Sequence, residues 1–501
     1  MKFKPTRQTV ILTIIFLFFA ARQLFLVMTL PPWQNHDEPA HFFYTSYLVE
    51  EKKLPLQTGA IEPRTLSFSE EYAKSELITD TSRLMKSHNE QLRRVHQRFR
   101  DYELDYAQIS RTLTGLSRDI MVRSSTDPQY FNIYYRLPAD GVYKNSAAPY
   151  QPLYYALEAI PYLLFYHQDI IVRLYALRIF STIFYLLTLW LCFLTARRLK
   201  GSFNFSLTLL LIIGLLPVYS HLMAGVNNEA LLIMLTTLSI YCLIRLLQNF
   251  SLKNTVLLGI TLGLGMLTKP QFAAIPLLAI IPFGYHWAKN SLPKKKVIYL
   301  FALCAIIATL LSGWWFAWSW ENQSSVFSAT DSNNEIITGA PGWKTAAIYY
   351  LYRWMYGFAS FFYAFGFATE MVLPRLIIVF LTGLFILSLI GLVKGATERY
   401  RFSSSARKAE NWILAISILL LELFFLYIFS KTLWQTGQAR FPIDGRYYLP
   451  VAFSVIYFWL LGLKSLLPVR LHNLLYSTLS IAMIVINAVA IFYTILPKFF
   501  L

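Results

Sequence analysis

Long apolar runs, separated by short polar segments, follow one another along almost the whole chain of 501 residues. A helix of about 20 apolar residues is long enough to cross the hydrocarbon core of a bilayer. The pattern therefore predicts an all-α polytopic membrane protein with about 11 transmembrane helices. We place them at 9–30, 171–195, 204–222, 229–248, 254–268, 271–288, 297–318, 373–393, 411–430, 446–464 and 471–494.

Composition agrees with this architecture, since 56% of the residues are hydrophobic and only 14% are charged. The net charge of +18 does not indicate nucleic acid, because most basic residues fall in short loops, where they orient the protein and meet anionic lipid. Three cysteines, Cys192, Cys242 and Cys304, lie inside apolar runs. They are expected to be buried small side chains, with no disulfide framework and no metal-binding spacing.

Basic residues in alternate loops predict the orientation. The N-terminus is basic, and one parity places it on the same side as the basic loops near 197–200, 245–253, 289–296, 394–408 and 464–470. Lys and Arg favour the cytoplasmic side of a membrane, so that side is predicted to be cytoplasmic. The fit requires that 150–167, which is short and contains two prolines and a Glu, lies on the outer surface. If this segment crosses the membrane, the predicted orientation of every later span is inverted.

Three regions follow from this topology. Residues 1–30 form the first transmembrane helix, and 31–170 form a large outer loop with surface helices, including a charged helical stretch within 62–127. Residues 171–501 form a multi-helix transmembrane domain whose outer loop, 319–372, is rich in aromatic residues. The Trp residues at 314–320 suit an interfacial belt or a groove for a lipid chain or a sugar.

The most informative polar segment follows the first span and contains Asp37, Glu38, Pro39 and His41. Asp37 could cap a surface helix that has Pro39 in its first turn. Alternatively, a carboxylate at a membrane boundary could act as a general base, with its pKa raised by the low dielectric. His41, one helical turn after Asp37, could orient it or pack at the interface.

Several basic residues on the predicted outer side do not follow the preference of Lys and Arg for the cytoplasmic side. Lys269, between two apolar runs, could snorkel to the surface or bind a lipid phosphate. Arg446 opens the tenth span in the same unusual way. Arg178 and Arg22 lie deeper in their spans, where either could pair with a phosphate or with a buried carboxylate.

Asn228 and Glu229 begin the fourth span, where an Asn cap and a first-turn Glu are ordinary helix chemistry. They could also contact a metal or a substrate. Polar residues therefore gather at the outer face, and this convergence indicates an active site that opens outward.

These segments together resemble the GT-C class of membrane glycosyltransferases, and more closely a largely uncharacterised bacterial family of GT-C-like membrane proteins. The matching pieces are 31–41, 148–155, the region of 177–178, 216–229, 268–270, 365–374 and 444–450. The resemblance implies a bacterial cytoplasmic membrane protein that uses a polyprenyl-phosphate-linked sugar as donor. It also implies an inverting transfer, with a catalytic carboxylate that maps onto Asp37 and has Glu38 as neighbour.

Lys269, Arg446 and Arg178 are the candidates for binding the donor phosphate. Some GT-C relatives hold a metal through acidic residues of the second outer loop. Here that place has Asn227, Asn228 and Glu229, so a divalent metal stays uncertain. The acceptor, whether a glycan, a lipid or a protein, is left open by the sequence.

Two other functions remain open. A polymerase or ligase of lipid-linked glycans would share the outer arginines but would not need the Asp-Glu motif. A transporter or flippase of a lipid-linked glycan should show paired half-repeats and polar residues near the bilayer midplane. The sequence shows no such repeat, and Arg22 is the one clear intramembrane polar residue.

Overall fold

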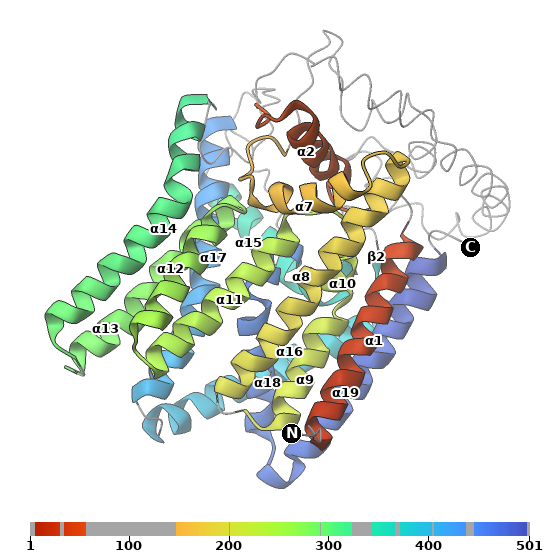
Figure 1. Cartoon of the computed structure of the whole chain (residues 1–501). Coiled ribbons are helices and arrows are strands. Elements are labelled where there is room, and N and C mark those ends of the chain that lie inside the picture. Colours follow the sequence, from red (N-terminus) through yellow and green to blue (C-terminus); the bar gives the residue numbers. More distant parts are fainter. Residues whose placement is uncertain are drawn as a thin grey trace.

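A computed structural model describes residues 6–30, 35–56, 147–199, 201–290, 292–322, 343–365, 371–402, 405–436 and 445–497. The charged helical stretch predicted within 62–127 lies outside these residues. The described part consists almost entirely of helices that run side by side between two ends of the molecule (Figure 1).

Eight helical segments of this described part are long and apolar enough to cross a membrane. They are α1 (Arg7–Thr29), α8 (Ile170–Arg198), α11 (Glu229–Gln248), α14 (Lys294–Asn322), α16 (Arg375–Phe402), α17 (Ser405–Thr436), α18 (Ala452–Leu466) with the preceding η3 (Gly445–Val451), and α19 (His472–Val489) with η4 (Val469–Leu471) and η5 (Ala490–Ile495). Shorter segments occupy the other three predicted spans: α9 (Phe203–Leu215), α12 (Leu252–Met266), and η1 (Pro270–Ala279) with α13 (Ile280–Ala288). The predicted all-α polytopic membrane fold is confirmed.

Two predicted spans differ from continuous α-helices. The span at 204–222 is interrupted after α9, because α10 (Pro217–Leu222) begins with a proline that cannot donate a backbone hydrogen bond. The span at 271–288 begins as the 3-10 helix η1, which contains Pro276, before α13 continues it. Both breaks lie at prolines inside apolar runs.

The interruption after α9 explains why Arg22 lies inside the first span. Arg22 Nη1 lies 3.4 Å from the carbonyl oxygen of Gly214, and its Nε donates to Asn487 Oδ1 at 2.7 Å. Asn487 Nδ2 donates in turn to the carbonyl of Leu215 at 3.2 Å. Arg22 therefore stabilises the carboxyl end of α9, where a cation is favourable. Among the described residues its partners are amide, hydroxyl and carbonyl groups and not the buried carboxylate that was one of its two predicted partners, and the phosphate stays a prediction.

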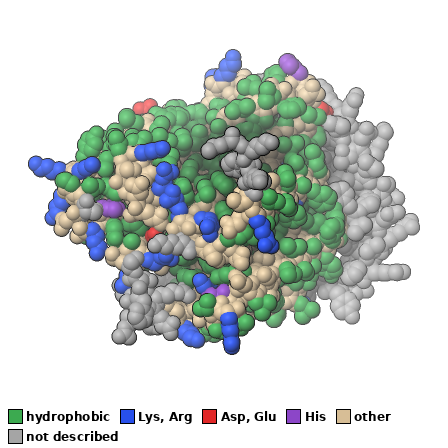
Figure 2. Space-filling view, turned by 60° about the horizontal axis from the view of Figure 1, so that its bottom comes forward, with side chains coloured by type: hydrophobic (Ala, Val, Ile, Leu, Met, Phe, Trp, Pro, Cys, Tyr) green, Lys and Arg blue, Asp and Glu red, His purple; other side chains and the backbone are tan. Residues whose placement is uncertain are grey.

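The two ends of the bundle differ in character. One end carries α2 (Glu38–Glu51) and α7 (Leu153–Leu164), and we call it the α2 face (Figure 1). The opposite end, the basic face, carries many Lys and Arg side chains (Figure 2). They lie on or beside the loops predicted to be basic: Arg197, Arg198, Lys253, Lys289, Lys294, Lys295, Lys296, Lys408, Lys464 and Arg470.

Short elements cover the α2 face. Helix α7 has 12 residues and is about 18 Å long, too short for a hydrocarbon core of about 30 Å. It lies across the end of the bundle (Figure 1), in keeping with a surface-lying segment at 150–167. The segment predicted at 319–372 contains α15 (Trp343–Tyr363) and an antiparallel pair of two-residue strands, β1 (Ala364–Phe365) and β2 (Met371–Val372), in which Ala364 opposes Val372.

Helix α11 lies at the centre of the bundle, since 78% of its most apolar stretch is buried inside the protein, compared with 17% for the corresponding stretch of α16. Its first residue, Glu229, therefore lies under the α2 face in the middle of the molecule.

Candidate functional site

The chain enters α2 through a strained residue, Asp37. Its φ of 52° and ψ of 14° lie in the left-handed region, which few residues other than Gly adopt, although Asp tolerates it better than most. Its side chain makes no capping hydrogen bond to the first N–H groups of α2. The structure therefore does not give Asp37 the helix-capping role. The side chain is instead 52% exposed.

Hydrogen bonds to α10 and to the loop that follows it hold the backbone next to Asp37. Asn35 Nδ2 donates to the carbonyl of His221 at 2.7 Å, and Asn227 Nδ2 donates to the carbonyl of His36 at 2.9 Å. Strained backbone persists where its surroundings over-determine it. These contacts help to hold Asp37 in its unusual conformation.

Glu38 is fully buried and bonded to α8. Arg178 donates from Nε to Glu38 Oε1 at 2.8 Å and from Nη2 to Oε2 at 2.6 Å, which makes a bidentate pair. Oε1 also accepts a hydrogen bond from the N–H of Val226 at 3.0 Å, and Arg178 Nη1 donates to the carbonyl of Leu30 at 2.6 Å. This Glu38–Arg178 pair joins the end of α1, the start of α2, α8 and the loop before α11.

The pairing changes the roles expected for both residues. Of the two partners predicted for Arg178, a phosphate or a buried carboxylate, the structure shows the carboxylate. Both oxygens of Glu38 are bonded within the protein, and both side chains are fully buried. A substrate therefore reaches neither group in this conformation, and the geometry favours a positioning role next to Asp37.

Arg446 approaches Asp37 from η3. Its Nη1 lies 3.2 Å from Asp37 Oδ2, and its guanidinium lies over the ring of Tyr447, 4.9 Å from the centroid. The preceding Gly445 packs closely on α15: its N–H donates to the Ser360 hydroxyl at 2.8 Å, and a Cβ at this position would collide with the α15 backbone. A cation 409 positions away in the sequence thus faces the carboxylate at the start of α2.

Lys269 lies between α12 and η1, where the following Pro270 favours the extended conformation that it adopts. Its ammonium is buried and lies 2.6 Å from Glu229 Oε1 at the start of α11. It also faces the rings of Tyr150 and Tyr447, 5.2 and 5.9 Å from their centroids. Lys269 is therefore not a snorkelling side chain, which would hold its charge in water.

Asp37, Glu229, Lys269 and Arg446 form one electrostatic cluster, which we call the charge cluster. Although the Asp37 side chain is half exposed, the protein around it displaces water and so raises its pKa; the positive charges around it, Arg446 foremost, outweigh this effect and hold the pKa below its usual value. Burial lowers the pKa of Lys269, and the Glu229 carboxylate opposes this effect. The raised pKa predicted for Asp37 is therefore wrong, and Asp37 is ionised at neutral pH.

His41 also interacts electrostatically with Asp37, but its direct contacts are with aromatic side chains. Its Nδ1 lies 2.8 Å from the Tyr155 hydroxyl, and its ring stacks between those of Tyr155 and Tyr150, at centroid distances of 5.8 and 6.0 Å. Burial lowers the pKa of His41 to about 3, so the imidazole is neutral at neutral pH. Of the two roles considered, packing at the interface describes its contacts better than orienting Asp37.

Asn228 and Glu229 present unused polar atoms. In the described part of the chain, neither amide atom of Asn228 has a hydrogen-bond partner, and neither does Glu229 Oε2. The N–H of Glu229 donates to Asn227 Oδ1 at 2.9 Å, so Asn227, not Asn228, caps α11. Within the described ranges, no three His, Cys, Asp or Glu side chains form a group that could hold a metal ion.

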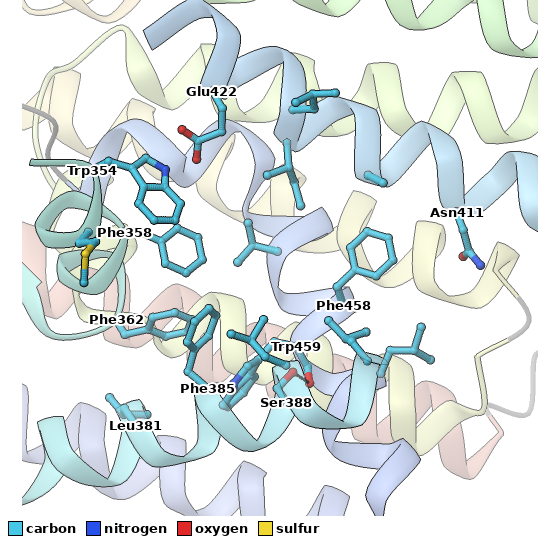
Figure 3. Close-up of a pocket in the computed structure, with 18 of the residues that line it drawn as sticks. Trp354, Phe358, Phe362, Leu381, Phe385, Ser388, Asn411, Glu422, Phe458 and Trp459 are labelled. Atoms are coloured by element: carbon cyan, nitrogen blue, oxygen red, sulfur yellow. Dashed lines mark hydrogen bonds between the residues drawn. The ribbon is translucent and has the colours of Figure 1, made fainter. Parts of the chain in front are cut away.

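A groove of about 1500 Å³, which no sequence pattern predicted, lies between α15, α16, α17 and α18 (Figure 3). Along α17 its lining extends from Lys408 to Glu422, about 21 Å at 1.5 Å per residue. Trp354, Phe385 and Trp459 are among its mostly apolar lining. The Trp residues of 314–320, the candidates for a lipid groove, are not part of it.

The lining of the groove contacts η3, the element that carries Arg446. Phe358, which lines the groove, packs with its ring 5.3 Å from that of Tyr448, and Phe425 lies 5.5 Å from the same ring. Tyr448 is two residues after Arg446. The apolar groove among the spanning helices therefore packs against the element of the α2 face that carries Arg446.

The sequence profile of a family described as "Predicted membrane protein (DUF2142)" matches residues 17–455. The chain belongs to this family. The matched range of the DUF2142 chain contains every residue of the charge cluster, and the match confirms the resemblance to a largely uncharacterised family of membrane proteins. No curated protein gives a significant match.

Two solved structures are similar to this DUF2142 protein. They are ArnT from Cupriavidus metallidurans bound to undecaprenyl phosphate, with a TM-score of 0.38, and the same protein in the apo state, with a TM-score of 0.36. Each is 15% identical over 70% of this chain. The similarity spans 63% of the ArnT chain, less than two thirds of its length.

Proposed function

We propose that the protein transfers a sugar from a polyprenyl-phosphate donor to an acceptor hydroxyl at the α2 face, with Asp37 as the general base. One observation carries this proposal. Asp37 is held in a strained conformation that leaves its carboxylate half exposed and in contact with Arg446, beside the buried ammonium of Lys269. Strain of this kind is concentrated at functional sites.

The proposed reaction is a single displacement. The acceptor oxygen attacks C1 of the sugar and gives its proton to Asp37, while the bond between C1 and the phosphate oxygen breaks. The electron pair leaves with the polyprenyl phosphate, whose charge Arg446 and Lys269 stabilise. Attack from the side opposite the leaving group inverts the anomeric centre.

The charge cluster also adjusts the base to the reaction. In the free site, Arg446 and Lys269 keep Asp37 ionised and therefore ready to accept a proton, but they also make it a weak base. A phosphate bound to the same cations offsets their charge and so raises the pKa of Asp37. The donor would thereby activate the base that its transfer requires.

The groove supports a lipid-linked donor. Its apolar lining lies among membrane-spanning helices (Figure 3), and Phe358 of this lining packs against Tyr448 of η3, the element that carries Arg446. A long hydrocarbon chain in this groove would place its phosphate near the charge cluster.

Orientation follows from charge. The exposed Lys and Arg residues of the basic face indicate that it is cytoplasmic, so we propose that the α2 face lies on the outer side of the cytoplasmic membrane (Figure 2). The less exposed cations at the α2 end are engaged differently, whereas Lys52 and Lys53 at the end of α2 are exposed. Lys269, Arg178 and Arg446 each make an ion pair, and so does Arg173, which lies 3.8 Å from Glu50.

A transfer assay tests the proposal. The purified protein in nanodiscs is supplied with radiolabelled undecaprenyl-phosphate sugars and a membrane extract as the source of acceptors. Arg446→Ala should weaken donor use about tenfold or more, since a hydrogen bond to a charged group contributes about 1.5–3 kcal/mol. Arg470→Ala, on the basic face, is the matched control. A wild-type protein that transfers no sugar from any such donor would contradict the proposal.

The groove has a separate test. Ala415→Trp fills the groove, whereas Ala305→Trp adds the same side chain at an exposed position on α14. Only the first variant should weaken undecaprenyl phosphate binding, as measured by native mass spectrometry. Equal affinities for the two variants would remove the groove from the account.

A further inference from the structure

The start of α11 holds an ammonium where the GT-C resemblance allows a metal. Lys269 Nζ lies 2.6 Å from Glu229 Oε1, and both side chains are almost fully buried. Two tyrosine rings, those of Tyr150 and Tyr447, face the same ammonium. The lysine is therefore a fixed part of the site and not a mobile surface charge.

The surrounding groups do not suit a divalent cation. Mg²⁺ and Mn²⁺ prefer several oxygen ligands, usually including carboxylates. Of the two carboxylates in the charge cluster, Glu229 is paired with Lys269 and Asp37 is paired with Arg446. The amide oxygen of Asn227 already accepts a hydrogen bond from the N–H of Glu229. Among the described residues at the start of α11, Glu229 Oε2 and Asn228 Oδ1 have no partner, but two oxygens are fewer than such an ion prefers. Two fixed positive charges beside these oxygens would repel a metal ion.

We infer that the site works without a divalent metal, and that Lys269, held by Glu229, supplies the positive charge for the phosphate of the donor. The inference rests on the proposed function, because it assigns the phosphate-binding charge of that reaction. Burying an ammonium is costly, and the carboxylate partner offsets the cost. The remaining oxygen of Glu229, which has no partner among the described residues, leaves this carboxylate able to accept a further hydrogen bond from the sugar.

Direct metal binding can be measured without any substrate. Mn²⁺ binding to the full chain in nanodiscs is followed by electron paramagnetic resonance. The wild-type protein should show no saturable site that depends on Glu229. Lys269→Asp removes the ammonium and adds a carboxylate beside Glu229, so it should create a saturable Mn²⁺ site, and Glu229→Gln in the same chain should abolish it.

Affinity for undecaprenyl phosphate gives the second readout. For the wild type, the dissociation constant should change less than twofold between EDTA and Mg²⁺. Lys269→Met alone should weaken binding about tenfold in both conditions. Lys269→Met combined with Glu229→Gln removes both charges and leaves no unpaired buried charge. A melting temperature near that of the wild type would show that this double variant is folded, and its affinity should be equally weak.

Mn²⁺ binding and affinity for undecaprenyl phosphate together distinguish failure of the metal-free site from failure of the proposed function. A wild-type Mn²⁺ site that Glu229→Gln removes, or an affinity that collapses in EDTA and returns with Mg²⁺, would overturn the inference. A protein that binds no undecaprenyl phosphate in either condition would contradict the proposed function. In that case the Mn²⁺ measurement still decides whether the site takes a metal.

Discussion

Asp37 shows how one residue carries both strain and charge. Its conformation turns the side chain away from the N–H groups of α2, and Arg446 then holds the carboxylate ionised. Transfer requires the ionised form of Asp37. The value of kcat/KM, which reports the free enzyme, should therefore persist as the pH falls. The acid limb of kcat/KM should lie below the ordinary Asp pKa of about 3.9. The profile should therefore be flat for this group between about pH 5 and 8.

The bound donor should shift the acid limb of the pH profile. Because the phosphate offsets the two cations, the acid limb of kcat, which reports the enzyme–substrate complex, should lie at higher pH than that of kcat/KM. Arg446→Ala should raise the limb of kcat/KM toward that of kcat. A kcat/KM limb near pH 6–7 that Arg446→Ala leaves unchanged would contradict this electrostatic account.

The Glu38–Arg178 pair should behave as a structural unit. Removing one partner leaves a buried charge uncompensated, which typically costs about 3–5 kcal/mol. Glu38→Gln or Arg178→Met should therefore lower the free energy of unfolding measured by denaturation in mild detergent. The double variant, Glu38→Gln with Arg178→Met, should recover part of the loss. If Glu38 were a second base instead, Glu38→Gln would lose transfer with its stability unchanged.

At the scale of elements, hydrophobic length and basic loops predict the spans well, because both reflect the bilayer itself. Helix α11 begins and ends at the predicted residues 229 and 248. Local backbone chemistry inside an apolar run is harder to predict. Pro217 breaks a span of ordinary length, and side chains far away in the sequence, those of Arg22, Tyr185 and Asn487, help to stabilise the break by donating to its carbonyls.

Helix α7 contains a buried acid that should make stability depend on pH. Burial raises the pKa of Glu158 to about 8 from the ordinary 4.5, while hydrogen bonds from Ser181 and Tyr154 oppose the rise. Between these two values the folded state keeps a proton that the unfolded chain has lost. The stabilisation is therefore complete below pH 4.5 and is lost as the pH rises through 8.

Glu158→Gln should remove this dependence. Between pH 6 and 8 the wild type should lose on the order of 1 °C of melting temperature per pH unit relative to the variant. Glu321→Gln, at an exposed position on α14, is the control. Parallel melting curves for wild type and Glu158→Gln across this range would show that Glu158 is ionised in the folded protein.

At the scale of the whole molecule, the sequence predicts which residues gather at the α2 face better than it predicts which partners they contact. Lys269 and Arg446 were detectable because each breaks the charge pattern of the membrane, and both reach the charge cluster. The partner of Arg178 was not predictable, since Glu38 lies 140 positions away. The groove leaves no sequence signal, because an apolar side chain that faces a groove resembles one that faces lipid.

The orientation of the bundle has its own test. In a background without Cys192, Cys242 and Cys304, all of which are buried, a cysteine replaces Lys295 on the basic face or Gln168 between α7 and α8. A membrane-impermeant thiol reagent applied to intact cells should label only the Gln168 variant. Labelling of the Lys295 variant from outside would invert the proposed topology.

The central claim is that Asp37 acts as the base of a lipid-phosphate-dependent sugar transfer. The most direct measurement is sugar transfer by Asp37→Asn alongside its affinity for undecaprenyl phosphate. Asn tolerates the left-handed conformation as well, so the backbone should be preserved. We predict a loss of transfer of about 10²–10⁴-fold, the usual contribution of a general base, with affinity retained within a few-fold. Near wild-type transfer by Asp37→Asn would contradict the account.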